Sequence, residues 1–489
     1  MTQVKKGLAR RTFLRNAMTA AGTVAAMPAM QGLNFIGSHG RISAAKGFGG
    51  YGPLVPTADL RDGVKRIALP EGFTYRTFSV AGELMSDGNR VPLAHDGMGV
   101  FNSSDGKFRL VRNHEDRNAA GSGTTEIASG LSYDKKGGGT TTLVVNPFTR
   151  ELERHWVSLS GTTVNCAGGV TPWGSWITCE ETNVGPPSGP PTPTSWLKQH
   201  GYCFEVPADV EGQVQAVPIL AMGRFSHEAL AVDPDTNIVY ETEDNGNNSG
   251  FYRYHSYTAG TLQDGKLEML AIKGAPQYST VNGQTVGAQL ATTWVPIATP
   301  NPSGTSSTAV FNQGLGLGGA RFARLEGCWY GNGAIYFAAT SGGDAGCGQV
   351  WEFRPYGNEG VLTLIYESPD ETELDAPDNL CVSPQGALLL CEDGDGDQFM
   401  RGVTLDGRIF DFAENIQNGF EWAGACFAEA DPSWNDRKVR GHNEPVGSRW
   451  DRVTLFANRQ GATNGGNPPS AGNEGMTFAI WGPWKEGAL

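Results

Sequence analysis

Carboxylates recur at the ends of short apolar segments in this sequence, and they are the residues whose chemistry stands out. Six segments share one pattern, in which a first residue is followed by small or apolar residues, usually a turn, and a second apolar stretch. The first residues are Asp96, Cys166, Glu228, Glu326, Asp378 and Ala423. Four of the second stretches end in acidic runs, at 113–116, 180–181, 241–244 and 392–393. If the segments come together, these carboxylates meet in one place.

Carboxylates packed this densely need cations. Crowding raises their pKa values and costs free energy unless positive charge neutralises them. Oxygen ligands suit Ca²⁺ or Mg²⁺, whereas the thiolate of Cys166 suits a softer or redox-active ion such as iron or zinc. The sequence therefore predicts a mixed site with more than one metal ion. A buried structural thiol is the alternative for Cys166, and acidic neighbours disfavour a nucleophilic role because they raise the pKa of a thiol.

Arg324 is the candidate for binding an anion at this site. It lies two residues before Glu326, and alternation along a strand places residues i and i+2 on the same side. Arginine binds oxyanions through paired hydrogen bonds, and a salt bridge to the neighbouring acids is the alternative. Metal ions together with this arginine favour phosphate-ester hydrolysis. His114 and His227 adjoin Glu115 and Glu228, where each could bind a metal or hydrogen-bond a metal-bound carboxylate.

The elements that must position these residues are short strands. Gly, Pro, Asn and Thr interrupt almost every apolar run and no long helical periodicity is present, which argues against a helical bundle or a doubly wound sheet. Repeated strand pairs with irregular spacing are typical of a propeller whose blades carry long insertions. We expect an all-β fold, a six-bladed β-propeller with long loop insertions, as a single domain over residues 46–489.

Charge and the N-terminal segment predict the compartment. The chain has 37 Lys and Arg against 51 Asp and Glu, so we expect no nucleic-acid partner. Residues 1–45 combine basic residues, the run R-R-T-F-L (10–14), a weakly apolar stretch and small residues. This pattern predicts a signal read by the twin-arginine export machinery and a periplasmic or secreted protein. No further apolar segment reaches spanning length, so we expect no membrane association after signal removal, and a monomer.

Several long runs carry a recognisable set of motifs. They are A-H-D-G-M (94–98), V-R-N-H-E (111–115), N-C-A-G-G-V-T-P-W-G-S-W-I-T-C-E-E (165–181), R-F-S-H-E-A (224–229), R-L-E-G (324–327), D-N-L (378–380), L-C-E-D (390–393), W-A-G-A-C-F (422–427) and T-F-A-I-W-G-P-W (477–484). These runs resemble the PhoX-type bacterial alkaline phosphatases. The resemblance implies an exported, monomeric six-bladed propeller that hydrolyses phosphomonoesters with iron, as two Fe³⁺ ions, and several calcium ions.

The resemblance also implies roles for individual residues. Cys166, Glu228 and Glu326 would hold metal ions, and Arg324 would bind the phosphate of a small phosphate-ester substrate. The remaining implied metal ligands are Asp96, Asn113, Glu115, Glu180, Asp378, Asn379 and Glu392. Two other functions stay open. A calcium-dependent propeller lactonase would need neither Cys166 nor Arg324, and a calcium-stabilised, non-enzymatic scaffold would bind metal without turnover.

Overall fold

Antiparallel strands joined by turns and loops make up almost all of the described chain. The computed structural model describes residues 49–431 and 448–489, and the expected export signal at 1–45 lies outside them. The first two sheets have four and three strands. One contains β4 (His95–Asn102), β5 (Phe108–His114), β6 (Gly138–Val145) and β7 (Leu152–Thr162), and the other contains β8 (Asn165–Val170), β9 (Ser175–Glu180) and β10 (Cys203–Pro207).

The middle of the chain forms one nine-stranded sheet. Its order is β11 (His227–Val232), β12 (Val239–Glu243), β13 (Phe251–Ser256), β14 (Gly265–Ile272), β15 (Gln289–Pro296), β19 (Glu359–Glu367), β18 (Gln349–Tyr356), β17 (Ala334–Ala339) and β16 (Leu325–Gly331). Strand β15 pairs with β19, so two four- or five-stranded halves meet at their outer strands. Consequently β11 and β16 are the two edges of this sheet.

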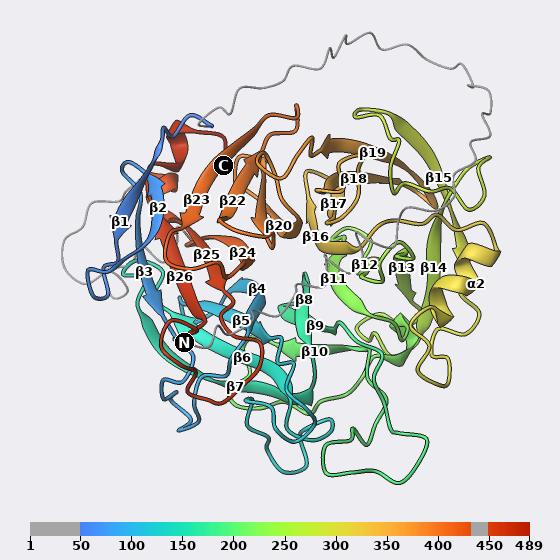
Figure 1. Ribbon diagram of the computed structural model, residues 1–489, viewed down its shortest axis with the longest axis horizontal. Helices are drawn as coiled ribbons and strands as arrows, with labels where there is room; N and C mark the ends of the chain where they lie inside the picture. Colours follow the sequence, from blue (N-terminus) through green and yellow to red (C-terminus); the bar gives the residue numbers. More distant parts are fainter. Residues whose placement is uncertain (1–48, 432–447) are drawn as a thin grey trace, which may run out of the picture. The chain divides into compact units, whose positions relative to one another are not determined.

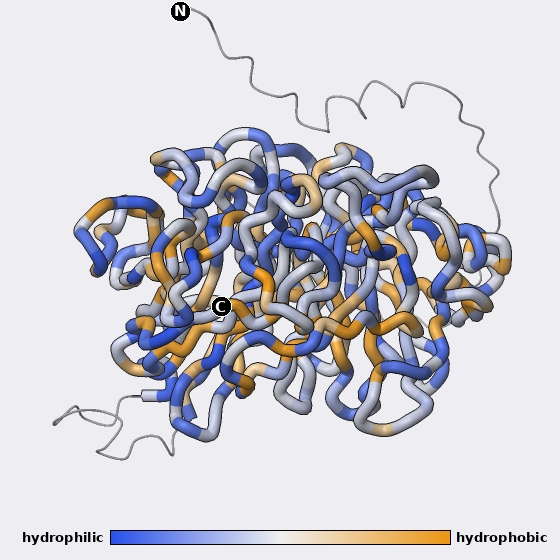
Figure 2. The backbone as a smooth tube through the Cα atoms, turned by 90° about the horizontal axis from the view of Figure 1, so that it is seen from below, coloured by the Kyte–Doolittle hydropathy of each residue, from blue (hydrophilic) through white to orange (hydrophobic). Residues whose placement is uncertain are grey.

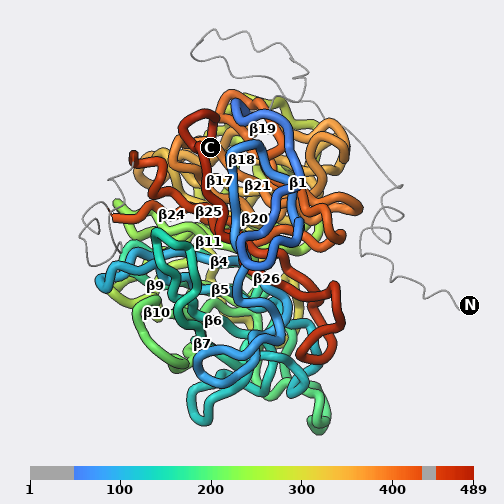
Figure 3. The backbone as a smooth tube through the Cα atoms, turned by 90° about the vertical axis from the view of Figure 1, so that its left-hand side faces the viewer, coloured from blue at the N-terminus to red at the C-terminus, as the bar shows by residue number. Residues whose placement is uncertain are grey.

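The last two sheets combine strands from both ends of the described chain. One contains β20 (Pro377–Val382), β21 (Leu388–Glu392), β22 (Gln398–Val403), β23 (Ile409–Asn415), β2 (Lys65–Pro70) and β1 (Leu54–Ala58). The other contains β24 (Trp422–Glu429), β25 (Val453–Arg459), β26 (Met476–Trp481) and β3 (Thr74–Phe78). Strand β1 pairs with β2, and β2 pairs with the late strand β23. Figure 3 shows the early strand β1 in blue in front of the late part of the chain. Such pairing ties the two ends of the described chain together.

Helical segments are few and short in the described part of the chain. They are α2 (Ala309–Gly316) and the 3₁₀ turns η1 (Leu220–Met222), η3 (Arg449–Arg452) and η4 (Trp484–Glu486). None of the helices within residues 49–431 and 448–489 has the length and apolarity needed to cross a bilayer. The prediction of an all-β class is confirmed. Hydrophobic stretches of the chain lie mostly inside the molecule, while many peripheral loops are hydrophilic (Figure 2).

Six first strands surround the centre of the described chain. Each borders the next, in the closed order β4, β8, β11, β16, β20, β24 and back to β4 (Figure 1). Neighbouring first strands approach each other closely because they carry glycine at the points of contact. A Cβ on Gly327 would lie 2.6 Å from the Asp378 carbonyl oxygen, and one on Gly424 would lie 2.5 Å from the Asp96 carbonyl oxygen. The glycines in the repeated segments therefore let neighbouring strands converge.

Replacing Gly327 by Ala should destabilise the protein and disturb the centre. The new Cβ would meet the backbone of Asp378 and Leu380 at 2.6 and 2.7 Å, and such overpacking costs about 1–3 kcal/mol. We expect a lower melting temperature in calorimetry. The control is Gly189→Ala, where a Cβ meets nothing within 4 Å. Equal melting temperatures for the two variants would contradict close convergence of the strands.

Candidate active site

A repeated backbone irregularity aims one side chain from each first strand toward the centre. Every residue at the start of the repeated pattern, from Asp96 to Ala423, is the second residue of its strand. In each of the six hairpins the register shifts across that residue, or directly after it at Ala423. Four of these strands are preceded by a residue in the left-handed region, namely Ala94, Val164, Arg324 and Ala376. Bulges of this kind redirect side chains beside functional sites.

The redirected side chains line a polar cavity of about 240 Å³. Asp96, Cys166, Glu228, Glu326 and Asp378 all contribute to its wall. All five side chains come from different strands, and Asp378 is the least buried of them. The ring that the repeat predicts is therefore present as a cavity lining.

A second ring comes from the residues that directly follow the second strands of the hairpins. Its members are Glu115, Glu181, Asp244, Thr340, Asp393 and Gln460. Four of them, Glu115, Glu181, Asp393 and Gln460, line the cavity. Gln460 donates hydrogen bonds to Asp96 (3.1 Å) and Glu115 (3.0 Å), which links the two rings.

Of the residues implied as ligands, four lie outside the cavity lining. Asn113 accepts a hydrogen bond from Trp176 (2.9 Å) and donates one to the Ala167 carbonyl oxygen (2.6 Å). Asn379 accepts a hydrogen bond from the Gly424 backbone N–H (3.0 Å) and donates one to Asp378 (2.7 Å). These two amides support the first strands, and Asn379 also contacts the carboxylate of a ring residue.

Glu180 and Glu392 are the other two, and each is the last residue of its strand. Glu180 contacts His200 at 2.6 Å, and Glu392 contacts Arg401 at 2.8 Å. Because side chains alternate along a strand, the following residues, Glu181 and Asp393, face the cavity instead.

The contact between Glu180 and His200 should make stability depend on pH. Burial lowers the pKa of His200, but Glu180 and Asp134 outweigh it and raise that pKa to about 9. A raised histidine pKa adds stability that is complete below pH 6.5 and is lost as the pH rises through 9, by about 3 kcal/mol. We expect His200→Gln to remove this dependence in urea unfolding at pH 6 and pH 9.5. The control is His255→Gln, which replaces a partly exposed imidazole and should keep the pH dependence of the wild type. If both variants lost the same amount of stability at each pH, the dependence would not come from His200.

The structure adds cavity residues that the sequence reasoning did not select. They are Arg117, Glu421, Gln460 and Thr463. Glu181 and Asp393, which also line the cavity, belong to the predicted acidic runs at 180–181 and 392–393 but were not selected as individual ligands. The sequence could have indicated Glu421, because it lies two residues before Ala423, just as Arg324 lies two residues before Glu326. It supplies the carboxylate that the sixth segment lacks at its ring position. Arg117 and Thr463 lie in loops, where no periodicity points to them.

Burial and mutual repulsion raise the pKa values of Glu115, Glu228 and Asp378 in the cavity. Burial and Glu181 raise the pKa of Glu115 to about 8, against the lowering effect of Arg117. Burial and Asp393 raise the pKa of Asp378 to about 7. Burial, with Asp378 next in size, raises the pKa of Glu228 well above its usual range. Ionising these groups together therefore requires cations.

Three groups of side chains in the cavity could each hold a metal ion. Their ligand atoms lie within 4.8 Å of one another, and the groups are Cys166 with Glu181 and Glu228, Glu228 with Glu326 and Asp378, and Asp378 with Asp393 and Glu421. Glu228 and Asp378 each belong to two groups, so the three form a chain across the cavity. Oxygen Oε1 of Glu228 is buried without a hydrogen-bond partner among the described residues. This donor set fits metal binding.

Two arginines bring positive charge to the same cavity. Arg324 contacts Asp244 through Nε and Nη2 (3.1 and 2.7 Å) and Glu326 through Nη2 (2.7 Å). Arg117 contacts Glu115 and Glu181, the latter at 2.8 Å. Arg324 thus both lines the cavity and forms the ion pair considered as its alternative role.

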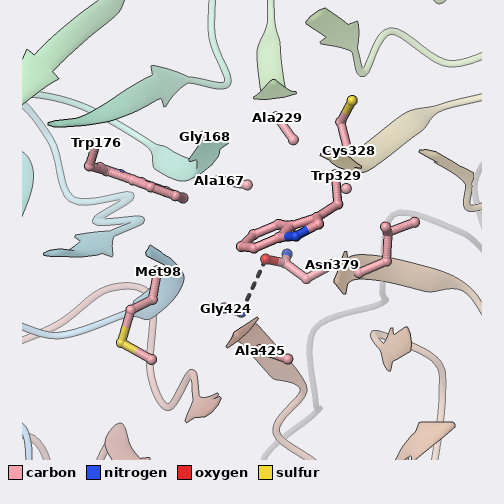
Figure 4. A pocket seen from close by; sticks show the side chains of 12 residues that line it. Met98, Ala167, Gly168, Trp176, Ala229, Cys328, Trp329, Asn379, Gly424 and Ala425 are labelled. Atoms are coloured by element: carbon pink, nitrogen blue, oxygen red, sulfur yellow. Dashed lines mark hydrogen bonds between the residues drawn. The ribbon is translucent and has the colours of Figure 1, made fainter. Parts of the chain in front are cut away.

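The next layer of residues is mostly apolar and combines residues of the first strands with Trp176 of β9. It encloses a void of about 10 Å³, lined by residues such as Met98, Ala167, Trp176, Ala229 and Trp329. Figure 4 shows the indole rings of Trp176 and Trp329 among these residues, and the hydrogen bond from Gly424 to Asn379. A void of this size holds one water at most.

Comparison with known proteins identifies the family. A family model described as alkaline phosphatase PhoX matches residues 49–155 and 145–461, which is most of the chain. The chain belongs to the alkaline phosphatase PhoX family. The family identifies the protein as a phosphatase and confirms the resemblance found in the motifs.

One solved structure supports the fold. The structure of Pseudomonas fluorescens PhoX in complex with vanadate, a transition-state analogue, matches with a TM-score of 0.62 at 16% identity, covering 91% of this chain and 99% of that chain. This likeness shows a shared propeller-like fold. A gluconolactonase from Xanthomonas campestris matches more weakly, with a TM-score of 0.33 at 13% identity, covering 82% and 98%. No curated protein matches the sequence.

Proposed function

We propose that this phosphatase hydrolyses small phosphomonoesters and releases inorganic phosphate in the acidic cavity. One observation carries the proposal, namely that a thiol, a chain of carboxylates and the Arg324 guanidinium share a single cavity of about 240 Å³. Cations held by the carboxylates and a guanidinium that binds oxyanions are the components that phosphoryl transfer to water requires.

We propose iron, as two Fe³⁺ ions, and several calcium ions as the bound metals. The group with Cys166 contains a thiol, whose thiolate suits iron. The two groups that share Asp378 contain only carboxylate oxygens, which suit calcium. When bound, such ions lower the pKa of water and neutralise charge on a phosphate ester.

The chain's own residues position the substrate. Asp244 and Glu326 hold the Nε and Nη2 side of the Arg324 guanidinium at the cavity wall, which leaves Nη1 to donate to a phosphate oxygen. Asn379 holds the carboxylate of Asp378 through its Nδ2, and Gln460 holds Asp96 and Glu115.

The finer architecture follows from the same ring of strands. We infer six blades, each beginning with one of β4, β8, β11, β16, β20 and β24, with the nine-stranded sheet counted as two blades joined through β15 and β19. We further propose a single propeller domain over 46–489, export by the twin-arginine route on a signal at 1–45, a periplasmic or secreted location and a monomeric state. The motif at 10–14 and the acidic composition support these statements.

Turnover of p-nitrophenyl phosphate tests the proposed function. Exported wild-type protein should hydrolyse it and lose activity in chelator, because the charges and water activation depend on the metals. Cys166→Ala should lose both iron and turnover, whereas Cys426→Ala, a buried cysteine outside the cavity lining, should keep both. Calcium binding without turnover in the wild type would instead indicate the scaffold, and hydrolysis of lactones alone would indicate the lactonase.

A further inference from the structure

A second group of potential ligands lies outside the cavity lining. It consists of Cys203 on β10, His227 on β11 and Glu241 on β12, whose ligand atoms lie within 4.8 Å of one another. All three side chains are fully buried. The group joins a strand of the three-stranded sheet to the edge of the nine-stranded sheet.

Glu241 has no satisfactory partner in this environment. Neither of its carboxylate oxygens accepts a hydrogen bond from any described residue. A buried carboxylate without hydrogen bonds is costly unless it is paired or binds a metal. The imidazole of His227 lies beside it, with Nδ1 3.3 Å from Oε2 of Glu241, and carries a charge only when both of its nitrogens are protonated.

The imidazole of His227 is held so that its Nδ1 points toward Cys203 and Glu241. Its Nε2 lies 3.2 Å from the Gly223 carbonyl oxygen, which can only accept, so Nε2 carries a proton. Stacking on Phe225, with centroids 3.6 Å apart, fixes the ring plane. Nδ1 therefore faces Glu241 and the Cys203 sulfur, which lies 3.4 Å away. A histidine that binds a metal usually has its other nitrogen held in this way.

The distances match the edges of a tetrahedral zinc site. Zinc bonds of about 2.0–2.2 Å to nitrogen and oxygen and about 2.3 Å to sulfur give edges of about 3.3 Å between nitrogen and oxygen and about 3.5 Å between nitrogen and sulfur. The corresponding distances here are 3.3 and 3.4 Å. The same geometry gives about 3.7 Å between two sulfurs, and the Cys179 sulfur lies 3.6 Å from that of Cys203.

We propose that Cys203, His227 and Glu241 bind a structural zinc ion, with the Cys179 thiol as the neighbour that completes the fourth position. Cys179 is not part of the three-residue group and would move toward it on binding. The ion would join β9 and β10 to β11 and β12. Because His227 directly precedes Glu228, it would also fix the strand that carries a cavity ligand. The site does not depend on the proposed phosphatase reaction.

Zinc K-edge absorption and elemental analysis of the exported wild-type protein test this proposal. We expect about one zinc per chain with sulfur at about 2.3 Å. Cys203→Ser and Glu241→Gln should each lose this zinc, whereas Cys166→Ser should keep it, which separates the site from the cavity. If the first two variants fail to fold, the wild-type spectrum alone decides.

Two results would overturn the proposal. One is wild-type protein without sulfur-bound zinc, or zinc that persists in both Cys203→Ser and Glu241→Gln. The other is a Cys179–Cys203 disulfide in peptide mass mapping, because these cysteines are register partners across β9 and β10. Loss of phosphatase activity in any variant does not enter the decision.

Discussion

Replacing Glu228 by Gln should lower phosphatase turnover by more than about 100-fold and remove more than one metal ion per molecule. Loss of a direct ligand should exceed the roughly 10–100-fold effect of an outer partner. Glu228 belongs to two of the three ligand groups, one with Cys166 and one with Glu326. Gln keeps the shape of the side chain but removes its charge, so both groups lose a ligand at once. Turnover of p-nitrophenyl phosphate and elemental analysis of the same preparation measure the two effects.

The matched control for this prediction is Glu352→Gln. Glu352 lies on β18, contacts Arg354 and Tyr336, and is not part of the cavity lining. It should retain wild-type turnover and metal content. Wild-type metal content in Glu228→Gln would contradict the shared role of this carboxylate, and a loss of only one ion would place it in one group alone.

Arg324→Lys should lower kcat/KM for phosphomonoesters by about 10²–10³-fold, the range typical for loss of one preorganised donor. Lysine keeps the charge but lacks the planar guanidinium, which contacts Asp244 and Glu326 through Nε and Nη2 and has Nη1 left for a phosphate. Inhibition by inorganic phosphate should weaken in parallel, while the metal content stays near wild type because arginine is not a ligand. Steady-state kinetics with phosphate as inhibitor, together with elemental analysis, separate these effects.

The control for Arg324 is a second arginine with similar pairing outside the cavity. Arg354→Lys removes a guanidinium that contacts Glu352 at 3.1 Å and should leave kinetics unchanged. Wild-type phosphate inhibition in Arg324→Lys would show that this side chain serves only as the ion-pair partner of Asp244 and Glu326. Arg117 would then be the remaining cavity arginine for the anion.

Much of the cavity was predictable because the chain repeats one short pattern. The repeat places Asp96, Cys166, Glu228, Glu326 and Asp378 at equivalent strand positions, and all five line the cavity. Along each strand, alternation determines which side chains face the cavity, but an error of one residue in the position of the strand assigns every side chain to the opposite face. Glu180 and Glu392 were selected from acidic pairs in which the following residue faces the cavity. To choose between the two acids of a pair, one must know at which residue the strand ends. An acidic run alone does not show where that residue is.

Other features depend on three-dimensional packing. Arg117 and Thr463 reach the cavity from loops, whose paths follow no period. The pairing of β15 with β19 joins two sets of strands into one sheet, and the return of β1, β2 and β3 to late strands is a long-range contact. The group of Cys203, His227 and Glu241 likewise combines three strands, two of them from a different sheet than the first. Its residues show no common spacing in the sequence.

Anomalous diffraction at the iron edge from crystals of the exported, active protein tests the central claim most directly. The account predicts iron in the polar cavity bonded to the Cys166 sulfur, with calcium at the oxygen-only groups around Asp378. Protein that hydrolyses p-nitrophenyl phosphate yet shows no metal in this cavity would contradict it.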